Sequence, residues 1–320
     1  MSRLTCVVAV LAVLATLTSP SLSAEGGAAA PTPKSVRISY AKSPFNLPLI
    51  VARRLGMLET AFGAKGIAVE YAEIDSGAKQ AEAMAALSID IAGVINTTSV
   101  IIAAAAGNDL KIVSGFSRPS GLFAIVVDDP AIRTVADLKG KRVAGPKGTV
   151  LHQLLMAALA RAGLGMGDVQ FVQMDIPAAQ TALLSRQVDA GLLAASAVVA
   201  AQSAGARVLV TAEGYLEPQL VTAVRGAFLR DYPSLVDLYV SVIGKAEDWI
   251  AAHEDEALAL GAKEQGIGVA EARRLAAASH FSPSIGPAEI EALESDAKFL
   301  LDSGMLARPF DPRSILAAIQ

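Results

Sequence analysis

Short apolar runs alternate with segments of helical spacing along the first part of the chain. Runs such as 36–40 (VRISY) and 68–74 (AVEYAEI) are rich in β-branched and aromatic residues and are typical of strands. Because short strands separated by helices form βαβ units, the pattern predicts a mostly parallel sheet. The expected strands are 36–40, 68–74, 89–95 and 110–114, and the expected helices are 47–58, 78–87 and 97–106.

The same alternation repeats after Gly121, and a helical tail follows from Phe228 onward. Two similar α/β blocks predict two lobes. Ligands of open α/β sheets bind at the carboxyl ends of the strands, so two facing lobes are expected to form a cleft that closes by hinge motion. In the second block the expected strands are 122–127, 142–144, 169–174, 190–193 and 207–210, the helices are 150–162, 178–185 and 194–204, and a further strand is expected at 220–224.

The first residues predict export. Arg3 precedes an apolar run from Leu4 to Leu17, and small residues end the segment at Ala24. This order is typical of a secretory signal peptide, and the run is too short for a membrane anchor, which needs about 20 apolar residues. We therefore expect a signal peptide over residues 1–24, a flexible Gly- and Pro-rich leader over 25–34, and a periplasmic product.

Composition and motifs argue against most other classes. Cys6 is the only cysteine and lies inside the expected signal peptide, so the mature chain would have no disulfide, thiolate metal site or cysteine nucleophile. The net charge of −4 argues against nucleic acid. His152, His253 and His280 lack metal-ligand spacing, and no nucleophile elbow, Walker loop or dinucleotide fingerprint is present. We expect no catalytic residue, no metal and no cofactor.

Several segments, taken together and in order, carry a resemblance to a known family. The chain is similar to the nitrate/sulfonate/taurine-type periplasmic solute-binding proteins of ABC transporters, the aliphatic-sulfonate and thiamine-precursor group. The resemblance covers residues from about 35 to 260. It rests on 47–58 (LPLIVARRLGML), 75–78 (DSGA), 105–108 (AAGN), 134–144 (TVADLKGKRVA), 148–149 (GT), 188–190 (VDA) and 228–240 (FLRDYPSLVDLYV).

The resemblance implies a type II periplasmic-binding-protein fold, with two α/β lobes, a two-segment hinge and a helical C-terminal tail. Residues 35–120 and 212–320 would form lobe 1, and residues 121–211 would form lobe 2. It also implies a monomer that captures a small anionic organic solute (a sulfonate, a nitrate-like anion or a carboxylate) and delivers it to an ABC permease and its ATPase. A sensory binding protein and a pyrimidine-forming thiamine-biosynthesis enzyme are the alternatives, and the enzyme is disfavoured because its cysteine-rich motif is missing.

Candidate ligand contacts lie in the loops that follow the expected strands. Unpaired N–H groups at helix N-termini stabilise anions, and Ser or Thr at such positions either caps the helix or donates to a ligand. In the resembling family the corresponding loops line the cleft. Lys42, Arg118 and Lys147 are candidate cations, for which a solvated surface charge is the other interpretation. The candidates are Lys42, Ser43, Asn46, Ser76, Gly77, Asn96, Thr97, Thr98, Arg118, Gly148 and Thr149.

One segment departs from the family's pattern. Many members carry a sequence like Trp-Asp-Pro after the late strand of the second lobe, whereas residues 193–197 here read LAASA. An amino-bearing ligand such as taurine needs a carboxylate partner, so the departure counts against it. We expect a roomier, more apolar pocket at this place. Tyr215 or Phe45 could supply an aromatic wall, although packing into the hinge or core is the favoured interpretation of both. His152, in the first turn of a helix, could approach the cleft.

Overall fold

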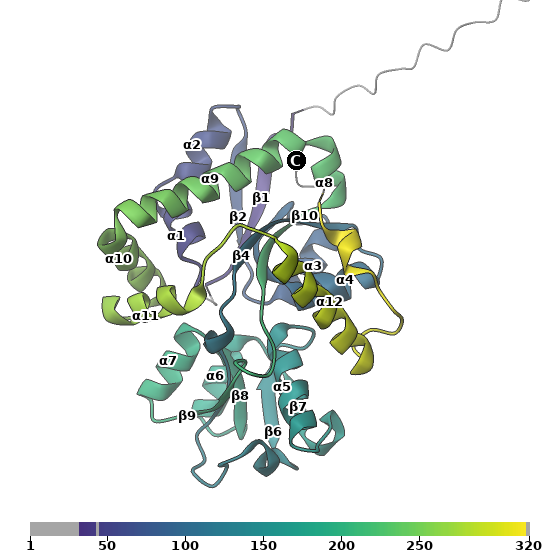
Figure 1. Cartoon of the computed structure of the whole chain (residues 1–320). Helices are drawn as coiled ribbons and strands as arrows, with labels where there is room; N and C mark the ends of the chain where they lie inside the picture. Colours follow the sequence, from purple (N-terminus) through teal and green to yellow (C-terminus); the bar gives the residue numbers. More distant parts are fainter. Residues whose placement is uncertain (1–31, 43–44, 318–320) are drawn as a thin grey trace, which may run out of the picture. The chain divides into compact units, whose positions relative to one another are not determined.

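The computed structural model describes residues 32–42 and 45–317, and its strands form two five-stranded sheets (Figure 1). The expected signal peptide, most of the leader and Ser43 lie outside the described residues. The first sheet has the order β2 (Ala68–Glu73), β1 (Ser35–Tyr40), β3 (Ile91–Asn96), β10 (Leu220–Arg225), β4 (Leu110–Ser117). The second has the order β7 (Gln170–Gln173), β6 (Arg142–Gly145), β8 (Ala190–Ala194), β5 (Phe123–Val127), β9 (Arg207–Thr211).

Each sheet contains one antiparallel strand, and it is the strand that enters from the other sheet. β10 runs antiparallel to β3 and β4, and β5 runs antiparallel to β8 and β9. The pairs β1–β2, β1–β3, β6–β7 and β6–β8 are parallel. The chain crosses between sheets twice, after β4 and after β9. The expected two-lobed α/β fold with mostly parallel sheets and a two-segment hinge is confirmed, while the residue limits of the lobes stay a prediction.

Twelve α-helices surround the sheets within the described ranges, and the expected helical tail is among them. In the tail, α9 and α10 pack against α1, and α12 packs against α4. Figure 1 shows these C-terminal helices beside the first sheet. The helices are α1 (Leu47–Arg54), α2 (Met57–Gly63), α3 (Gly77–Ala85), α4 (Thr97–Ala105), α5 (Val150–Arg161), α6 (Ile176–Leu184), α7 (Ser196–Ser203), α8 (Gly226–Asp231), α9 (Pro233–Ala252), α10 (Glu254–Gln265), α11 (Val269–Ser279) and α12 (Pro287–Asp302).

The single helix predicted over 47–58 is wrong. The structure has two helices there, because Gly56 adopts a left-handed conformation with φ +63° between α1 and α2. Glycine reaches this region without a steric cost, so it ends one helix and redirects the chain into the next. The apolar spacing continues across the break and conceals it in the sequence.

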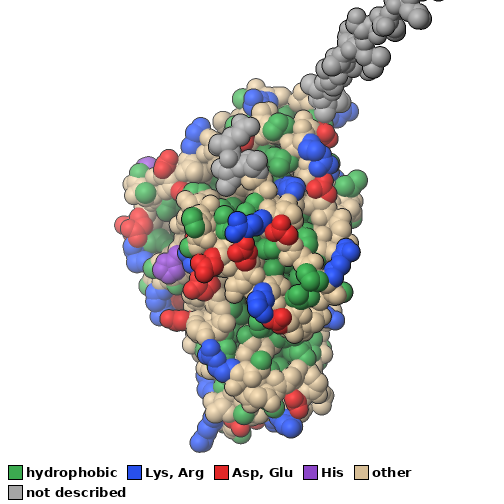
Figure 2. Space-filling view, turned by 45° about the vertical axis from the view of Figure 1, so that its right-hand side comes forward, with side chains coloured by type: hydrophobic (Ala, Val, Ile, Leu, Met, Phe, Trp, Pro, Cys, Tyr) green, Lys and Arg blue, Asp and Glu red, His purple; other side chains and the backbone are tan. Residues whose placement is uncertain are grey.

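Helices on both faces bury the central strands completely. Every residue of β3, β5 and β8 is buried, which explains why these strands read as continuous apolar runs instead of alternating. Among the described helices, none combines the length and the hydropathy needed to cross a bilayer. Figure 2 shows acidic and basic side chains interspersed over one face of the molecule, and the basic side chains do not gather into a patch on this face.

A buried carboxylate ties the strands of the first sheet together at the start of β3. The Asp90 side chain is 4% exposed and accepts hydrogen bonds from the backbone N–H of Arg37 at 2.9 Å and from the guanidinium groups of Arg37 and Arg225. Burial alone would raise the pKa of Asp90, but these hydrogen bonds outweigh burial and the pKa is lowered. Arg225 therefore serves the fold at this end of the sheet.

Candidate functional site

A cavity of about 30 Å³ lies between the carboxyl ends of the first sheet's strands and the second sheet. Both sheets line it, as expected for a ligand cleft of this fold. By the measure in which a cavity of about 10–15 Å³ holds one water molecule, this space has room for one or two waters. The apolar part of the lining includes Val94, Phe123, Leu151, Ile176 and Leu220, and the polar part comprises Asp75, Ser76, Gly77, Gln80, Asn96 and Thr149.

Four helices begin at this cavity. Gly77, Val150 and Ile176 are the first residues of α3, α5 and α6, and Asn96 is the N-cap of α4; all four line the cavity. The first N–H groups of a helix have no partner within it, and the helix dipole places partial positive charge there. Convergence of four such termini makes this cavity favourable for an anion.

Four of the residues predicted from the sequence line the cavity: Ser76, Gly77, Asn96 and Thr149. Oδ1 of Asn96 accepts from the Ser99 N–H at 2.9 Å and so caps α4. Oγ of Ser76 accepts only a long bond of 3.5 Å from the Lys79 N–H, and the Thr149 hydroxyl donates to the Pro146 carbonyl at 2.8 Å. Gly77 is required because an added Cβ would collide with Nδ2 of Asn96.

Other predicted residues join the helices around the cavity instead of lining it. The Thr97 hydroxyl donates to Oδ2 of Asp296 at 3.0 Å, and the Thr98 hydroxyl donates to Oε1 of Gln153 at 2.6 Å. The Gly148 carbonyl accepts from the Ser99 hydroxyl at 2.9 Å. These bonds connect α4 with α5, with the loop before α5 and with α12. Thr97, Thr98 and Gly148 therefore hold neighbouring helices together and do not line the cavity.

None of the three candidate cations lines the cavity. Nζ of Lys42 lies 2.8 Å from Glu73, and the Arg118 guanidinium lies 2.9 Å from Glu217 and 3.0 Å from Glu289. Among the described lining residues, Asp75 is the one ionisable side chain, and its Oδ1 accepts from the Lys42 N–H at 2.7 Å. An anion in this cavity would therefore be held by neutral donors.

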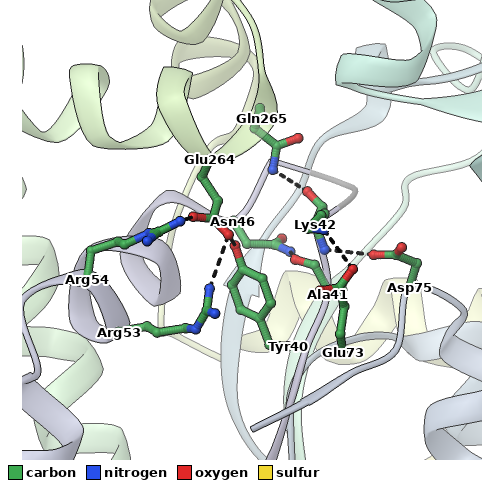
Figure 3. A network of polar contacts seen from close by, with 10 residues as sticks. All are labelled: Tyr40, Ala41, Lys42, Asn46, Arg53, Arg54, Glu73, Asp75, Glu264 and Gln265. Atoms are coloured by element: carbon green, nitrogen blue, oxygen red, sulfur yellow. Dashed lines mark hydrogen bonds and ion pairs between the residues drawn. The ribbon is translucent and has the colours of Figure 1, made fainter.

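The loop after β1 is held by the end of α10, which sequence reasoning missed (Figure 3). Glu264 accepts from the Tyr40 hydroxyl at 2.6 Å, from Arg53 at 3.1 Å and from Arg54 at 2.6 Å. Burial would raise the pKa of Glu264, but the bonds from Tyr40 and Arg54 lower it overall. In the same loop, Nδ2 of the buried Asn46 donates to the Ala41 carbonyl at 2.8 Å.

Gln265 extends this network to the second sheet. Its Nε2 donates to the Lys42 carbonyl, while its Oε1 accepts from the Ser196 hydroxyl at 2.6 Å. Ser196 is the first residue of α7. Nothing in the local sequence of α10 indicates these contacts, because their partners lie far away along the chain.

The remaining sequence expectations concern His152, Phe45, Tyr215 and residues 193–197. His152 is buried beside Phe171, with ring centroids 5.0 Å apart, and burial lowers its pKa to about 4, so it stays neutral. Phe45 is 1% exposed and belongs to the core. None of these residues lines the cavity. The roomier, more apolar pocket expected at 193–197 is therefore not part of it.

Comparison with known proteins gives consistent relatives. The family described as NMT1/THI5 like matches residues 44–257, about two thirds of the chain. A protein of Bacillus subtilis (strain 168) named as an aliphatic sulfonates-binding protein is 33% identical over 229 residues, covering 70% of this chain and 68% of the relative. One of the same designation from Escherichia coli (strain K12) is 30% identical over 256 residues, covering 77% and 76%.

A solved structure has the same fold. It is the alkanesulfonate-binding protein SsuA from Xanthomonas axonopodis pv. citri bound to MOPS, with a TM-score of 0.80 and 25% identity over 90% of this chain and 99% of that chain. These relatives are solute-binding proteins and not enzymes, and this chain is likewise a solute-binding protein. On the family match and these relatives, the chain belongs to the NMT1/THI5-like family.

Proposed function

We propose that this chain is the extracytoplasmic binding component of an ABC importer, which captures an aliphatic sulfonate between its two sheets. It would act as a monomer and deliver the solute to a permease and its ATPase. One observation carries the proposal. Four helix N-termini converge on a single cavity, and their dipoles place partial positive charge there.

The chemistry of a sulfonate suits this set of donors. A sulfonate keeps its charge across the physiological pH range and spreads it over three oxygens, so several neutral donors share it. Helix N–H groups, the Ser76 hydroxyl and the Asn96 amide are such donors, and the helix dipoles add partial positive charge. The apolar lining residues Val94, Phe123 and Leu151 suit a hydrocarbon tail.

The relatives support a simple alkanesulfonate. Two are named for aliphatic sulfonates, and the related crystal structure holds MOPS, itself a sulfonate. These names favour alkanesulfonates over nitrate and carboxylates, and we propose alkanesulfonates as the ligands. Taurine is an aminoethanesulfonate, and the Asp75 carboxylate in the cavity lining offers a partner for its ammonium group, so the titration includes taurine as the competing sulfonate.

Capture requires the two sheets to move apart. A cavity of about 30 Å³ is smaller than a sulfonate group with its tail, so a ligand enters only when the walls separate. The bonds that break on opening include Ser99–Gly148 at 2.9 Å and Lys79–Asp175 at 2.7 Å. Hinge closure around a ligand is the usual motion of folds with this connectivity.

Calorimetric titration tests the ligand. Ethanesulfonate, butanesulfonate and MOPS are expected to bind and to raise the melting temperature, because a ligand that binds only the folded state stabilises it. Ser76→Ala should weaken sulfonate binding roughly tenfold by removing one donor from the cavity. Ser185→Ala is the matched control, because the Ser185 hydroxyl is exposed and donates to the Thr181 carbonyl of α6. Tighter binding of nitrate or acetate than of every sulfonate would refute the assignment, and tighter binding of taurine than of ethanesulfonate would assign an aminosulfonate instead.

Cell fractionation tests the location. The signal peptide expected over residues 1–24 implies that the protein accumulates in the periplasm of a Gram-negative host, shortened at its N-terminus. Mass spectrometry of the periplasmic fraction should give a mature N-terminus near residue 25. Full-length protein in the cytosolic fraction would contradict export. The ligand assignment would be unaffected, because the titration tests it separately.

A further inference from the structure

Gln153 lies where helices from both sheets meet. Its Oε1 accepts from the Thr98 hydroxyl of α4 at 2.6 Å, and its Nε2 donates to Oδ1 of Asp296 on α12 at 2.8 Å. The Thr97 hydroxyl donates to the other carboxylate oxygen of Asp296 at 3.0 Å. Thr98, Gln153 and Asp296 are 1%, 2% and 7% exposed. The side chains of this cluster are therefore bonded to one another and almost entirely buried.

One amide connects the two sides of the cavity. α5 packs against strands of the second sheet, whereas α4 packs against strands of the first and against α12. Gln153 lies one helical turn after Thr149, the N-cap whose side chain lines the cavity. Because an amide accepts on one atom and donates on another, Gln153 satisfies Thr98 and Asp296 together. It thereby positions the N-terminus of α5 beside that of α4.

Asp296 makes this contact sensitive to protonation. Burial raises its pKa to about 6, against the opposing hydrogen bonds from Gln153 and Thr97. Asp296 also lines a neighbouring cavity of about 470 Å³, with Gln153 on the opposite helix. Separation of α5 from α12 would expose the carboxylate to water and return its pKa toward the ordinary 3.8.

The charged groups around Asp296 do not replace it in this role. α4 contains no titratable residue, and on α5 the neighbouring His152 has a pKa lowered by burial to about 4. The same cavity is lined by Arg118, Glu217 and Glu291, and Arg118 is paired with Glu217. Of the other charged groups near α12, Glu289 pairs with Arg118, Glu294 with Arg313 of the following turn, and Lys298 with Asp302.

We propose that Gln153, Thr98 and Asp296 form a proton-linked latch that holds the two sheets together over the ligand cavity. Gln153 and Asp296 are positioning residues in it, since neither touches the ligand cavity. The binding tests of the latch use a sulfonate and so rest on the proposed function. Closure of the two sheets can also be measured without any ligand.

The sign of the pH effect follows from the raised pKa. Closure favours the protonated carboxyl, so its contribution is complete below pH 3.8 and is lost as the pH rises through about 6. A protonated carboxyl still has a carbonyl oxygen that accepts from Gln153. We expect butanesulfonate to bind about tenfold more tightly at pH 5 than at pH 7.5.

Closure is measured directly with two spin labels. Glu82 on α3 and Ala178 on α6 are exposed and lie one on each side of the interface. Cys6 lies inside the expected signal peptide, so a mature chain has no cysteine of its own and only cysteines introduced at 82 and 178 carry the labels. The short-distance population should grow as the pH falls from 7.5 to 5. A distance distribution that does not change with pH would overturn the latch.

Variants separate the latch from general effects on folding. Asp296→Asn keeps the shape and removes the titration, so its butanesulfonate affinity should be nearly constant with pH and close to the wild-type value at pH 5. Gln153→Ala should weaken binding about tenfold at pH 5, by loss of two hydrogen bonds. Gln202→Ala, an exposed glutamine of α7, should behave as wild type.

Two results distinguish failure of the latch from failure of the proposed function. If the wild type binds sulfonates, but Asp296→Asn keeps the wild-type pH dependence or Gln153→Ala binds as tightly as Gln202→Ala, the latch is wrong and the ligand assignment stands. If no sulfonate binds, while the label distances shorten with falling pH in the wild type and not in Asp296→Asn, the latch stands and the ligand assignment is wrong.

Discussion

The two ends of the first sheet have opposite electrostatic environments. At the start of β3 the buried Asp90 carboxylate is matched by Arg37 and Arg225. At the end of β3, Asn96 caps α4 and the neighbouring Gly77 and Ser76 begin α3, with no cation from the described lining residues. One end is electrostatically complete within the chain, and the other offers partial positive charge from helix termini.

This difference separates a structural site from a binding site. A buried charge that is fully paired cannot exchange partners without a large cost, so it stabilises the fold and binds nothing else. Neutral donors at helix N-termini make a milder environment, where an anion can bind and leave. Four experiments test this contrast, beginning with the largest expected effect.

Asp90→Asn should lower the free energy of unfolding by about 3 kcal/mol, because it leaves two guanidinium groups without their carboxylate. Since the pKa of Asp90 is lowered, its contribution is present above pH 3.8 and is lost as the pH falls through the lower folded value. Urea unfolding at pH 7 and pH 3 measures both effects. Asp189→Asn is the matched control. Asp189 accepts from the Arg142 N–H in the second sheet but is more exposed, so the loss should be about 1 kcal/mol.

Gly77→Ala should disturb the binding end. The added methyl group displaces the Asn96 amide and lies 2.8 Å from Oγ of Ser99, so both the α4 cap and the Ser99–Gly148 bond are strained. We expect a loss of about 1–3 kcal/mol in stability and at least tenfold weaker sulfonate binding, measured by calorimetry. Gly63→Ala, at a helix position with open space, should leave binding unchanged. Equal affinities of the two variants would contradict the close-approach argument.

Gln265 and Ser196 should be coupled. Ser196→Ala removes the bond across the sheets, and Gln265→Glu keeps an acceptor for Ser196 but loses the donor to the Lys42 carbonyl. Each change is expected to cost about 1 kcal/mol of ligand binding. A double-mutant cycle of Ser196→Ala with Gln265→Ala should give a coupling energy of roughly 0.5–1 kcal/mol. Simple additivity would show that the bond does not contribute to closure.

Lys42→Ala and Arg118→Ala should have the smallest effects. Both cations are partly exposed and ion-paired away from the cavity, so each substitution should change sulfonate affinity less than twofold. Titration at low and moderate salt checks this, because screening would reduce any remaining long-range attraction. A tenfold loss in either variant would restore the sequence-based interpretation that these side chains bind the anion.

The elements were predictable because their signals are local. β3 and β5 read as strands from a few consecutive apolar residues, and α5 reads as a helix closed by Gly163. Ser76, Gly77, Asn96 and Thr149 could be proposed because each stands where a helix begins after a strand. The break at Gly56 escaped detection because apolar spacing continues through it, and a left-handed φ leaves no periodic signal.

The sequence by itself determined the order of strands and helices, and with it the class of fold, because periodicity and turn chemistry act over a few residues. The tertiary structure alone decided which charges are paired. Arg118 pairs with Glu289 and Gln153 donates to Asp296, although the residues of each pair are more than 140 positions apart in the sequence. Such contacts depend on how distant helices pack, and no local pattern encodes the distance between two side chains that only folding brings together.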